Sequence, residues 1–302
     1  MQQVLHCPHC KNTIQKANGR YLCKYCDRTY PILEDIPCFV DQNRTFDGFD
    51  ASSFAFLFKM EQRHFWHTGR KKIILDVLRR NIANLTECRM LEIGCGNGNI
   101  LTYLEANGID IEGGDIFIEG LRFCRRRSNS TNLYLLDILS LPFRNNFEII
   151  GIFDVLEHIE NDMDALSEIN MSLKPGGNLI LTVPAYQLLW SPFDEGVGHK
   201  RRYGLKDIRA KLESSGFVVK KISFYVFFLF PIIAAIRLIT KALPVNNKKR
   251  KIETVIEANT IPVINSIFSA LLKLEMILMR YTNLPFGSSL LVLAEKKKNL
   301  GT

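Results

Sequence analysis

A short segment at residues 90–93, typical of a buried strand, runs directly into a glycine-rich turn that contains Gly94, Gly96 and Gly98. Glycine adopts backbone angles that other residues avoid, and it lets the chain approach a ligand closely. Residues 99–107 are typical of a helix, and free amides at a helix N-terminus favour an anionic group. A strand, a glycine turn and a helix in this order predict an α/β fold. Dinucleotide-binding domains carry a similar turn, so the turn alone leaves the ligand open.

Three further predicted strands each end in an acidic residue. Residues 110–114 precede Asp115, residues 132–136 precede Asp137, and residues 147–153 precede Asp154. Open α/β sheets bind ligands at the carboxyl edge of their strands, and a βαβ unit places an acid for a ribose about 20 residues after the glycine turn. A turn at residues 173–177 then leads into a fifth strand at residues 178–183. The pattern predicts a doubly wound sheet with its site at that edge.

Five stretches of this region resemble the class I S-adenosylmethionine-dependent methyltransferases. They are LEIGCGNGN, the acid in GGDIF, LLDILSLPF, FDVLEHIEND and LKPGGNLILTVP, and together they cover residues 89–184 in the order of that family. The resemblance implies a seven-stranded Rossmann-like methyltransferase sheet with S-adenosyl-L-methionine as cofactor. It also implies an in-line displacement at the sulfonium centre, in which positioning of the reactants does most of the work.

The resemblance also implies a role for each matching residue. Glu92 and the turn at residues 94–99 would hold the methionine end of the cofactor, and Asp115 would bind the ribose hydroxyls. Asp137 and Ile138 would face the adenine, and Asp154 would border the transferred methyl group. For the acids, the alternative is a helix cap or a surface position. The expected cofactor-binding set is Glu92, Gly94, Cys95, Gly96, Asn97, Gly98, Asp115, Asp137, Ile138 and Asp154.

Two CxxC pairs lie near the start of the chain. Twelve residues separate the two pairs, and residues 18–19 between them (Asn-Gly) suit a hairpin turn. Two such pairs can place four thiolates in the tetrahedron that zinc accepts, which predicts a zinc ribbon at residues 1–45. A closed four-thiolate shell leaves no open position, so we expect a structural zinc and no metal catalysis. The predicted ligands are Cys7, Cys10, Cys23 and Cys26.

The other four cysteines are scattered without the spacing of a disulfide framework. Thiols that are not paired into disulfides are typical of a reducing compartment, so a cytoplasmic protein is expected. Cys7 also lies where the apolar part of a signal peptide would be, so none is expected.

The chain offers three candidate catalytic residues. His158 follows the fourth predicted strand, and an imidazole is suited to act as a general base. Asp194 and His199 lie in a long polar loop after the fifth strand and could form an acid–base pair. Arg201 and Arg202 of that loop suit phosphate or carboxylate. The alternatives are that His158 only orients its loop, and that the polar loop is a solvated basic turn before a helix at residues 205–215.

The segment before the first strand predicts a cap over the cofactor pocket. In related methyltransferases this region covers the cofactor, and His64 and Trp66 are the candidates here, directly before a basic amphipathic helix at residues 69–81. The alternative is that both side chains are packing groups.

A long apolar insertion separates a predicted strand at residues 217–222 from the last strand, at residues 289–295. Residues 222–236 and 258–272 carry no charge, yet each run is 15 residues, shorter than the ~20 that span a bilayer. Four cations at residues 248–251 lie between them. The pattern favours contact with an anionic membrane surface without spanning, and the alternatives are a buried lid or a dimer interface. The predicted division is a core at 46–222, the insertion at 223–286 and the last strand at 287–298.

The net charge of +8 favours anionic partners. HFWH, GHKRRY and the insertion resemble bacterial methyltransferases of lipid-linked glycan or isoprenoid metabolism. The expected function is O-methylation of an amphiphilic or phosphate-bearing, lipid-linked small molecule, with the protein peripheral at the inner face of the membrane. One alternative is an RNA methyltransferase, because ribosomal RNA guanine methyltransferases also join a zinc ribbon to this fold. Another is a non-catalytic zinc-ribbon adaptor with a degenerate core. The acceptor, its methylated atom, the base and the oligomeric state stay open.

Overall fold

The computed structural model describes residues 4–40, 53–128, 131–242 and 261–298. The predicted boundary between residues 45 and 46 and the basic cluster at residues 248–251 lie outside these ranges.

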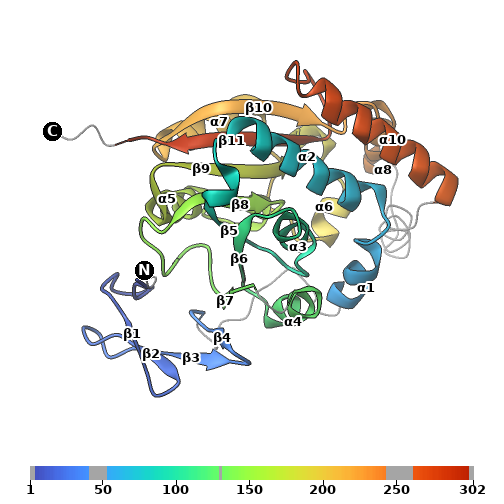
Figure 1. Cartoon of the computed structure of the whole chain (residues 1–302). Coiled ribbons are helices and arrows are strands. Elements are labelled where there is room, and N and C mark those ends of the chain that lie inside the picture. Colours follow the sequence, from blue (N-terminus) through green and yellow to red (C-terminus); the bar gives the residue numbers. More distant parts are fainter. Residues whose placement is uncertain (1–3, 41–52, 129–130, 243–260, 299–302) are drawn as a thin grey trace.

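A seven-stranded sheet forms the centre of the molecule (Figure 1), in the order β10-β11-β9-β8-β5-β6-β7. Its strands pair in parallel except for β11, which runs antiparallel to both of its neighbours. This order and the single reversed strand confirm the predicted doubly wound seven-stranded methyltransferase sheet. The strands are β5 (Arg89–Ile93), β6 (Asp110–Asp115), β7 (Leu133–Leu135), β8 (Phe147–Phe153), β9 (Leu173–Pro184), β10 (Phe217–Tyr225) and β11 (Ser289–Lys296).

Helices cover both faces of this sheet. The strand order reverses between β5 and β8, and crossovers between parallel strands are right-handed, so the helices before β8 and those after it lie on opposite faces. α2 (Phe65–Asn81), α3 (Asn99–Glu105) and α4 (Ile118–Arg127) form the first layer, with α1 (Ser53–Met60) against α4. α5 (Asp162–Ser172) and α7 (Leu205–Ser214) form the second. Shorter helices are η1 (Leu85–Glu87), η2 (Leu156–His158), η3 (Gln187–Leu189) and α6 (Pro192–Gly196).

Several predicted boundaries need correction. The predicted turn at residues 173–177 is part of β9, because Leu173 already pairs with Phe147 before a bulge in the register. β10 continues to Tyr225, past the predicted domain boundary at residue 222, because its partner β11 extends equally far. α2 begins at Phe65 instead of residue 69, since the His64 side chain accepts a hydrogen bond from the Trp66 amide and caps the helix there.

The N-terminal segment folds as a small four-stranded antiparallel sheet beside the edge strand β7 (Figure 1, blue). Cys38 forms a parallel bridge with Leu135, and the Phe39 amide donates to the Leu135 carbonyl at 2.7 Å. The contact places a polypeptide segment along an edge strand that would otherwise present unpaired backbone groups. The strands are β1 (Gln15–Ala17), β2 (Arg20–Leu22), β3 (Thr29–Leu33) and β4 (Ile36–Pro37).

The insertion contains two described helices, α8 (Phe230–Ala242) and α10 (Pro262–Leu278). α10 packs on α2, where Asn265 accepts a 2.7 Å hydrogen bond from the Phe65 amide and Leu272 fills the space beside Gly69. Both helices nevertheless leave many apolar side chains exposed. Among the described residues, no helix combines the length and apolarity needed to cross a membrane.

Candidate functional site

The turn after β5 depends on glycine at two positions. Gly94 and Gly98 have φ angles of +75° and +72°, in the left-handed region. A side chain at Gly94 would collide with Val155, and one at Gly98 would collide with the Cys124 thiol. The turn therefore packs closely on its neighbours and ends at the N-terminus of α3, for which Gly98 is the cap residue.

A cavity of about 260 Å³ opens beside this turn, at the carboxyl edge of the sheet. The glycine turn, the ends of β6 and β8, and residues from α1 and α2 line it. Eight of the ten predicted cofactor residues contribute to its wall: Glu92, Gly94, Cys95, Gly96, Asn97, Asp115, Ile138 and Asp154.

Gly98 and Asp137 are not part of the cavity wall. The Asp137 carboxylate instead accepts a 2.9 Å hydrogen bond from the Leu139 amide, and its side chain is buried. Leu136 and Ile138, on either side of it, do line the cavity. The acid after β7 thus shapes the loop that presents these apolar neighbours, and the expected contact of Asp137 with the adenine stays a prediction.

Glu92 carries a buried carboxylate oxygen that lacks a hydrogen-bond partner. Its side chain lines the cavity, and Oε2 has no donor in the part of the chain that the structure describes. Burial raises the pKa of Glu92 well above its usual value. Buried polar atoms are nearly always paired in folded proteins, so this oxygen points to a ligand donor such as an ammonium group.

Asp115 closes the glycine turn from the opposite side. Oδ2 accepts a 2.8 Å hydrogen bond from the Gly96 amide, and Oδ1 accepts one of 2.9 Å from the Phe117 amide. Burial raises the pKa of Asp115 to about 6, although the backbone amides oppose that shift. Each oxygen keeps a second lone pair, so the carboxylate can hold the turn and accept a ligand hydroxyl at once.

Arg70 is a cavity residue that the sequence analysis missed. It comes from α2 and forms an ion pair with Asp154, whose other oxygen accepts a 3.1 Å hydrogen bond from the Thr182 hydroxyl. Phe54 and Glu61 from α1 and the following turn line the cavity as well. The helical pattern of this segment carries no sign of these contacts, because they join residues more than 80 positions apart.

His64 and Trp66 do not line the cavity, contrary to the predicted cap. His64 caps α2, and the Trp66 ring stacks on Tyr225 with centroids 5.5 Å apart. Both side chains are packing groups, and the segment covers the cavity through its neighbours Phe54, Leu57 and Arg70 instead.

His158 and His199 come together beside the cavity, with ring centroids 4.8 Å apart. His158 lines the cavity, and its Nδ1 lies 3.3 Å from the Gly198 carbonyl. Burial, followed by the neighbouring His199, lowers the pKa of His158 to about 4. His199 Nε2 lies 3.8 Å from an oxygen of Glu157, a fully buried carboxyl group that has no hydrogen-bond partner within the described chain. Burial raises the pKa of Glu157 to about 8.

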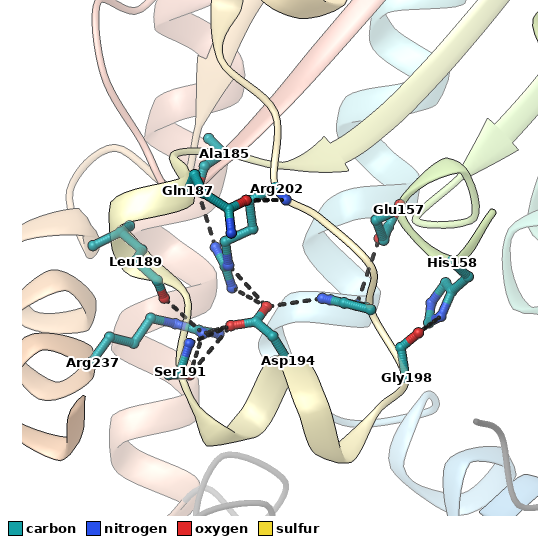
Figure 2. A network of polar contacts seen from close by, with 11 residues as sticks. Glu157, His158, Ala185, Gln187, Leu189, Ser191, Asp194, Gly198, Arg202 and Arg237 are labelled. Carbon is teal, nitrogen blue, oxygen red and sulfur yellow. Dashed lines mark hydrogen bonds and ion pairs between the residues drawn. The ribbon is translucent and has the colours of Figure 1, made fainter. Parts of the chain in front are cut away.

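Asp194 anchors the loop that carries His199 (Figure 2). Oδ1 lies 2.8 Å from His199 Nδ1 and accepts hydrogen bonds from Arg202, while Oδ2 accepts from the Ser191 amide and from Arg237 of α8. Burial alone would raise the pKa of Asp194, but the bonds from His199 and Arg202 and the charge of Arg237 outweigh it and hold the pKa well below its usual value. Of the two anions that Arg202 was expected to suit, phosphate or carboxylate, it thus binds a carboxylate, that of Asp194 in its own loop.

Two groups of side chains have the arrangement of metal ligands. Glu157, His158 and His199 each offer one ligand atom, all within 4.8 Å of one another. In the N-terminal segment, Cys7, Cys10, Cys23 and Cys26 do the same. The Cys7–Cys26 and Cys10–Cys23 sulfur pairs are 3.6 and 3.3 Å apart, close to the edge of about 3.8 Å that a tetrahedron with 2.3 Å zinc–sulfur bonds requires.

Comparison with known proteins agrees with this geometry. Residues 91–181 match the family model described as "Methyltransferase domain". The chain carries a class I S-adenosylmethionine-dependent methyltransferase domain. The matched residues run from β5 into β9, so they include the glycine turn, Asp115, Asp154 and His158, whereas the cavity residues from α1 and α2 lie outside the match.

Curated relatives match the methyltransferase domain and little else. The malonyl-[acyl-carrier protein] O-methyltransferase of Enterobacter lignolyticus is 25% identical over 43% of this chain and 54% of its own length. The tRNA U34 carboxymethyltransferase of Pseudoalteromonas translucida is 29% identical over 35% of each chain. The fatty-acid O-methyltransferase of Mycolicibacterium smegmatis is 34% identical over 33% of this chain and 38% of its own. The chain thus spans about half the length of these relatives or less.

A solved structure shares the fold over a longer stretch. It is a chain from the complex between the Haloferax volcanii Trm112 methyltransferase activator and a methyltransferase. That chain is 19% identical, with a TM-score of 0.55 over 83% of this chain and 97% of the other. The likeness shows that the two chains share a fold over most of their length.

Proposed function

We propose that the protein transfers a methyl group from S-adenosylmethionine to an oxygen atom of an amphiphilic, lipid-linked acceptor. The unpaired Glu92 oxygen in the cavity wall carries the cofactor part of this proposal. The ammonium group at the methionine end of the cofactor would supply the missing donor. Hydrogen bonds that involve charged groups contribute about 1.5–3 kcal/mol. Asp115 would accept the ribose hydroxyls, and Ile138 would pack against the adenine.

Bound S-adenosylmethionine supplies an electrophilic methyl group on a positively charged sulfur. The acceptor oxygen would bond to this methyl carbon as the carbon–sulfur bond breaks with its electron pair on sulfur, and a base of this chain would take the acceptor O–H proton. We assign this base to His199. Asp194 accepts a hydrogen bond from His199 Nδ1–H, and this tautomer leaves the lone pair on Nε2, toward Glu157 and His158. Two arginines already neutralise Asp194, so its contribution is orientation more than charge.

His158 would line the path between this base and the cavity. Its low pKa keeps it neutral at pH 7 and makes it a weak base, so it suits an orienting contact with the acceptor. Replacing His199 by Ala should spare cofactor affinity, because His199 is not part of the cavity wall. The His199→Ala variant should lose ~100-fold or more in turnover, the usual scale of a general base.

The surface of the insertion supports an amphiphilic acceptor and a membrane partner. Ile232, Ile236 and Ile239 of α8 are each more than half exposed, and α10 exposes Val263 and Ile267 to a similar degree. Contiguous exposed apolar patches mark binding surfaces in soluble proteins. The four cations at residues 248–251 lie between the two helices in the sequence and suit anionic headgroups. We propose peripheral attachment of these helices to the cytoplasmic face of a membrane.

The four-cysteine site would hold a structural zinc ion. The sulfur spacing fits a tetrahedral shell, and the Tyr30 hydroxyl lies 3.0 Å from the Cys7 sulfur as an outer hydrogen bond. A small sheet of this size buries little apolar surface, so metal binding would supply much of its folding free energy.

RNA methylation is the second candidate. The tRNA-modifying relative and the net charge of +8 favour it. The exposed isoleucines of α8 and α10 disfavour it, since RNA surfaces are recognised by cations and aromatic rings. A non-catalytic adaptor is disfavoured because the glycine turn, Glu92 and Asp115 together form an intact cavity.

Methyl transfer from labelled cofactor separates these functions. Full-length protein is incubated with S-adenosylmethionine labelled in the methyl group and with either extracted bacterial lipid or total RNA. We expect label in the lipid fraction, in a product that resists the mild base that cleaves methyl esters if the linkage is an ether. The Glu92→Gln variant serves as the inactive control. Label in RNA alone would replace the lipid proposal, and label in neither fraction would contradict both.

A further inference from the structure

Helix α8 exposes its apolar residues and buries a charge. Ile236 is 51% exposed, whereas the next residue, Arg237, is only 8% exposed. Its side chain leaves the helix toward the loop after β9 and ends beside Asp194 (Figure 2). A guanidinium group is removed from water only when its partners compensate for the lost solvation, so this contact needs an explanation beyond packing.

Several partners of Arg237 belong to the loop that carries His199. Nη1 donates to Asp194 Oδ2 at 2.9 Å and to the Ser191 hydroxyl at 2.8 Å. The guanidinium also lies 5.2 Å from the centre of the Phe193 ring. Ser191 and Asp194 are the capping pair at the start of α6, so Arg237 binds the N-terminal turn of that helix.

Asp194 connects this contact to the catalytic end of the loop. Its other oxygen lies 2.8 Å from His199 Nδ1, and His199 Nε2 faces Glu157 at 3.8 Å. One carboxylate therefore lies between a side chain of the insertion and the proposed base. Arg202 binds the same carboxylate, but it comes from the same loop as His199. Its contact therefore does not connect Asp194 to α8.

We propose that Arg237 is a positioning residue that links the seating of α8 on a membrane to the placement of His199. This inference rests on the membrane attachment proposed above. Within the described part of the chain, the isoleucines of α8 at positions 232, 236 and 239 are more than half exposed, while the Arg237–Asp194 ion pair ties the inner face of the helix to α6. When the outer face of α8 binds an anionic bilayer, the helix is fixed by the bilayer on one side and by Asp194 on the other. The positions of Asp194 and His199 are then fixed with it.

Hydrogen exchange measured by mass spectrometry tests the link on the full-length protein without a methyl acceptor. The peptides of interest cover residues 187–203, and the probe is a vesicle of phosphatidylglycerol and phosphatidylcholine. Cosedimentation measures vesicle binding separately. We expect vesicles to slow exchange in this segment at least threefold in the wild-type protein, because α6 opens less often when α8 is seated.

Three variants separate positioning from simple loss of structure. Arg237→Gln keeps a donor for Ser191 but loses the charge, and it should bind vesicles while exchange at residues 187–203 no longer responds to them. Arg237→Lys should restore at least half of the response. Lys241→Leu, on the same helix but away from Asp194, should keep the full response. A merely structural role would raise exchange equally with and without vesicles and leave their ratio intact.

Each outcome decides between the proposals. Vesicle binding without slower exchange in the wild-type protein would overturn the Arg237 link and leave membrane attachment standing. An equal vesicle response in Arg237→Gln and wild-type protein would also overturn the link. Absence of vesicle binding would overturn both. Because no methyl acceptor is used, a failure to methylate lipid would show itself only in the labelling experiment.

Discussion

Arg70 of α2 and Asp154 at the end of β8 form an ion pair in the wall of the cofactor cavity. The pair joins α2, which precedes the large sheet in the chain, to the end of its central strand β8. The Thr182 hydroxyl donates to the other oxygen of Asp154 at 3.1 Å. Asp154 has a φ of 56°, so its backbone is strained and its side chain is aimed by the local turn. At the site, α2 and the sheet are thus joined by the Arg70–Asp154 ion pair.

Removing this contact should weaken cofactor binding. Arg70→Met keeps the length of the side chain but leaves Asp154 without its cation, and the cap loses its tie to β8. We expect the dissociation constant for S-adenosylmethionine to rise about tenfold, which corresponds to ~1.4 kcal/mol. Isothermal titration calorimetry measures it. Arg79→Met on the exposed part of the same helix is the matched control and should bind normally. Equal affinity in both variants would show that the ion pair has no part in binding.

Asp115 should have two roles, to hold the glycine turn and to bind the ribose hydroxyls of the cofactor. Asp115→Asn keeps the shape and can still accept one backbone amide, but it loses the charge that favours ribose hydroxyls and the Gly96 turn. We expect a loss of about 1.5–3 kcal/mol in cofactor binding free energy, and a similar or larger loss for Asp115→Ala. Glu119→Gln, in the first turn of α4, should bind as the wild-type does. Calorimetry at pH 8, where Asp115 is ionised, gives the comparison, and unchanged affinity would mean that the carboxylate only supports the turn.

The buried acids predict an unusual pH dependence of stability. Burial raises the pKa of Glu157 from 4.5 to about 8. Between these values the folded chain binds more protons than the unfolded chain, so the free energy of unfolding falls as the pH rises from 4.5 toward 8. Asp115, raised to about 6, adds a fall between pH 4 and 6. The protein without cofactor should be more stable at pH 6.5 than at pH 8, by about 1–2 kcal/mol, since below pH 6.5 the lowered pKa of His158 changes the stability in the opposite direction.

Glu157→Gln tests the source of that dependence. Since the amide does not ionise, the variant should lose most of the fall in unfolding free energy between pH 6 and 8. Urea unfolding at several pH values measures it. Glu160→Gln, three residues on and largely exposed, should follow the wild-type curve. A Glu157→Gln curve that still falls as steeply above pH 6 would show that other groups carry the dependence.

Metal analysis should find about one zinc ion per chain in reduced protein. The four thiolates near residues 7–26 form one four-ligand site, and zinc with four sulfur ligands is the expected closed shell. A strong chelator should unfold the N-terminal sheet and raise proteolysis there while cofactor binding persists. Zinc in a Cys10→Ser variant should fall well below one per chain. Reduced protein that contains no zinc, and takes up none when it is added, would contradict the ribbon.

The parts of the site that were predicted from sequence are local ones. Glu92, the glycine turn and Asp115 lie at the ends of adjacent strands, where a strand–turn–helix pattern fixes their place. Asp137 shows the limit of that logic, because its loop turns the carboxylate toward the Leu139 amide. The pattern gives the strand end but not the rotation of the side chain that follows.

Contacts between residues far apart in the chain could not be predicted from the sequence. Arg237 and Asp194 are 43 residues apart, and the apolar pattern of α8 suggested only an exposed or buried face. In the same way, Arg70 belonged to a basic helix that resembles a solvated surface. Only the packing of α2 on the sheet shows that this one cation faces inward.

The exposed face of α8 and α10 should bind anionic membranes without spanning them. We expect the full-length protein to sediment with phosphatidylglycerol vesicles. Binding should weaken with salt, because cations near headgroups contribute about 1 kcal/mol each and are screened. Replacing Ile236, Ile239 and Ile267 together by Glu should lower vesicle binding at least tenfold, since three half-exposed apolar groups then carry charge. Cofactor affinity should not change, because none of the three lines the cavity.

A matched control shows whether the effect belongs to this face. Val218 of β10 is 43% exposed and lies outside the insertion, so Val218→Glu adds a like charge elsewhere on the surface and should leave binding intact. Deleting residues 226–284 is the stronger version. Tyr225 and Ser289 already face each other across β10 and β11, so residues 285–288 can serve as a hairpin turn between them. That variant should stay in the soluble fraction. If the intact protein does not bind anionic vesicles at low salt, the insertion is a folded lid, and the proposal of a lipid-linked acceptor loses its main support.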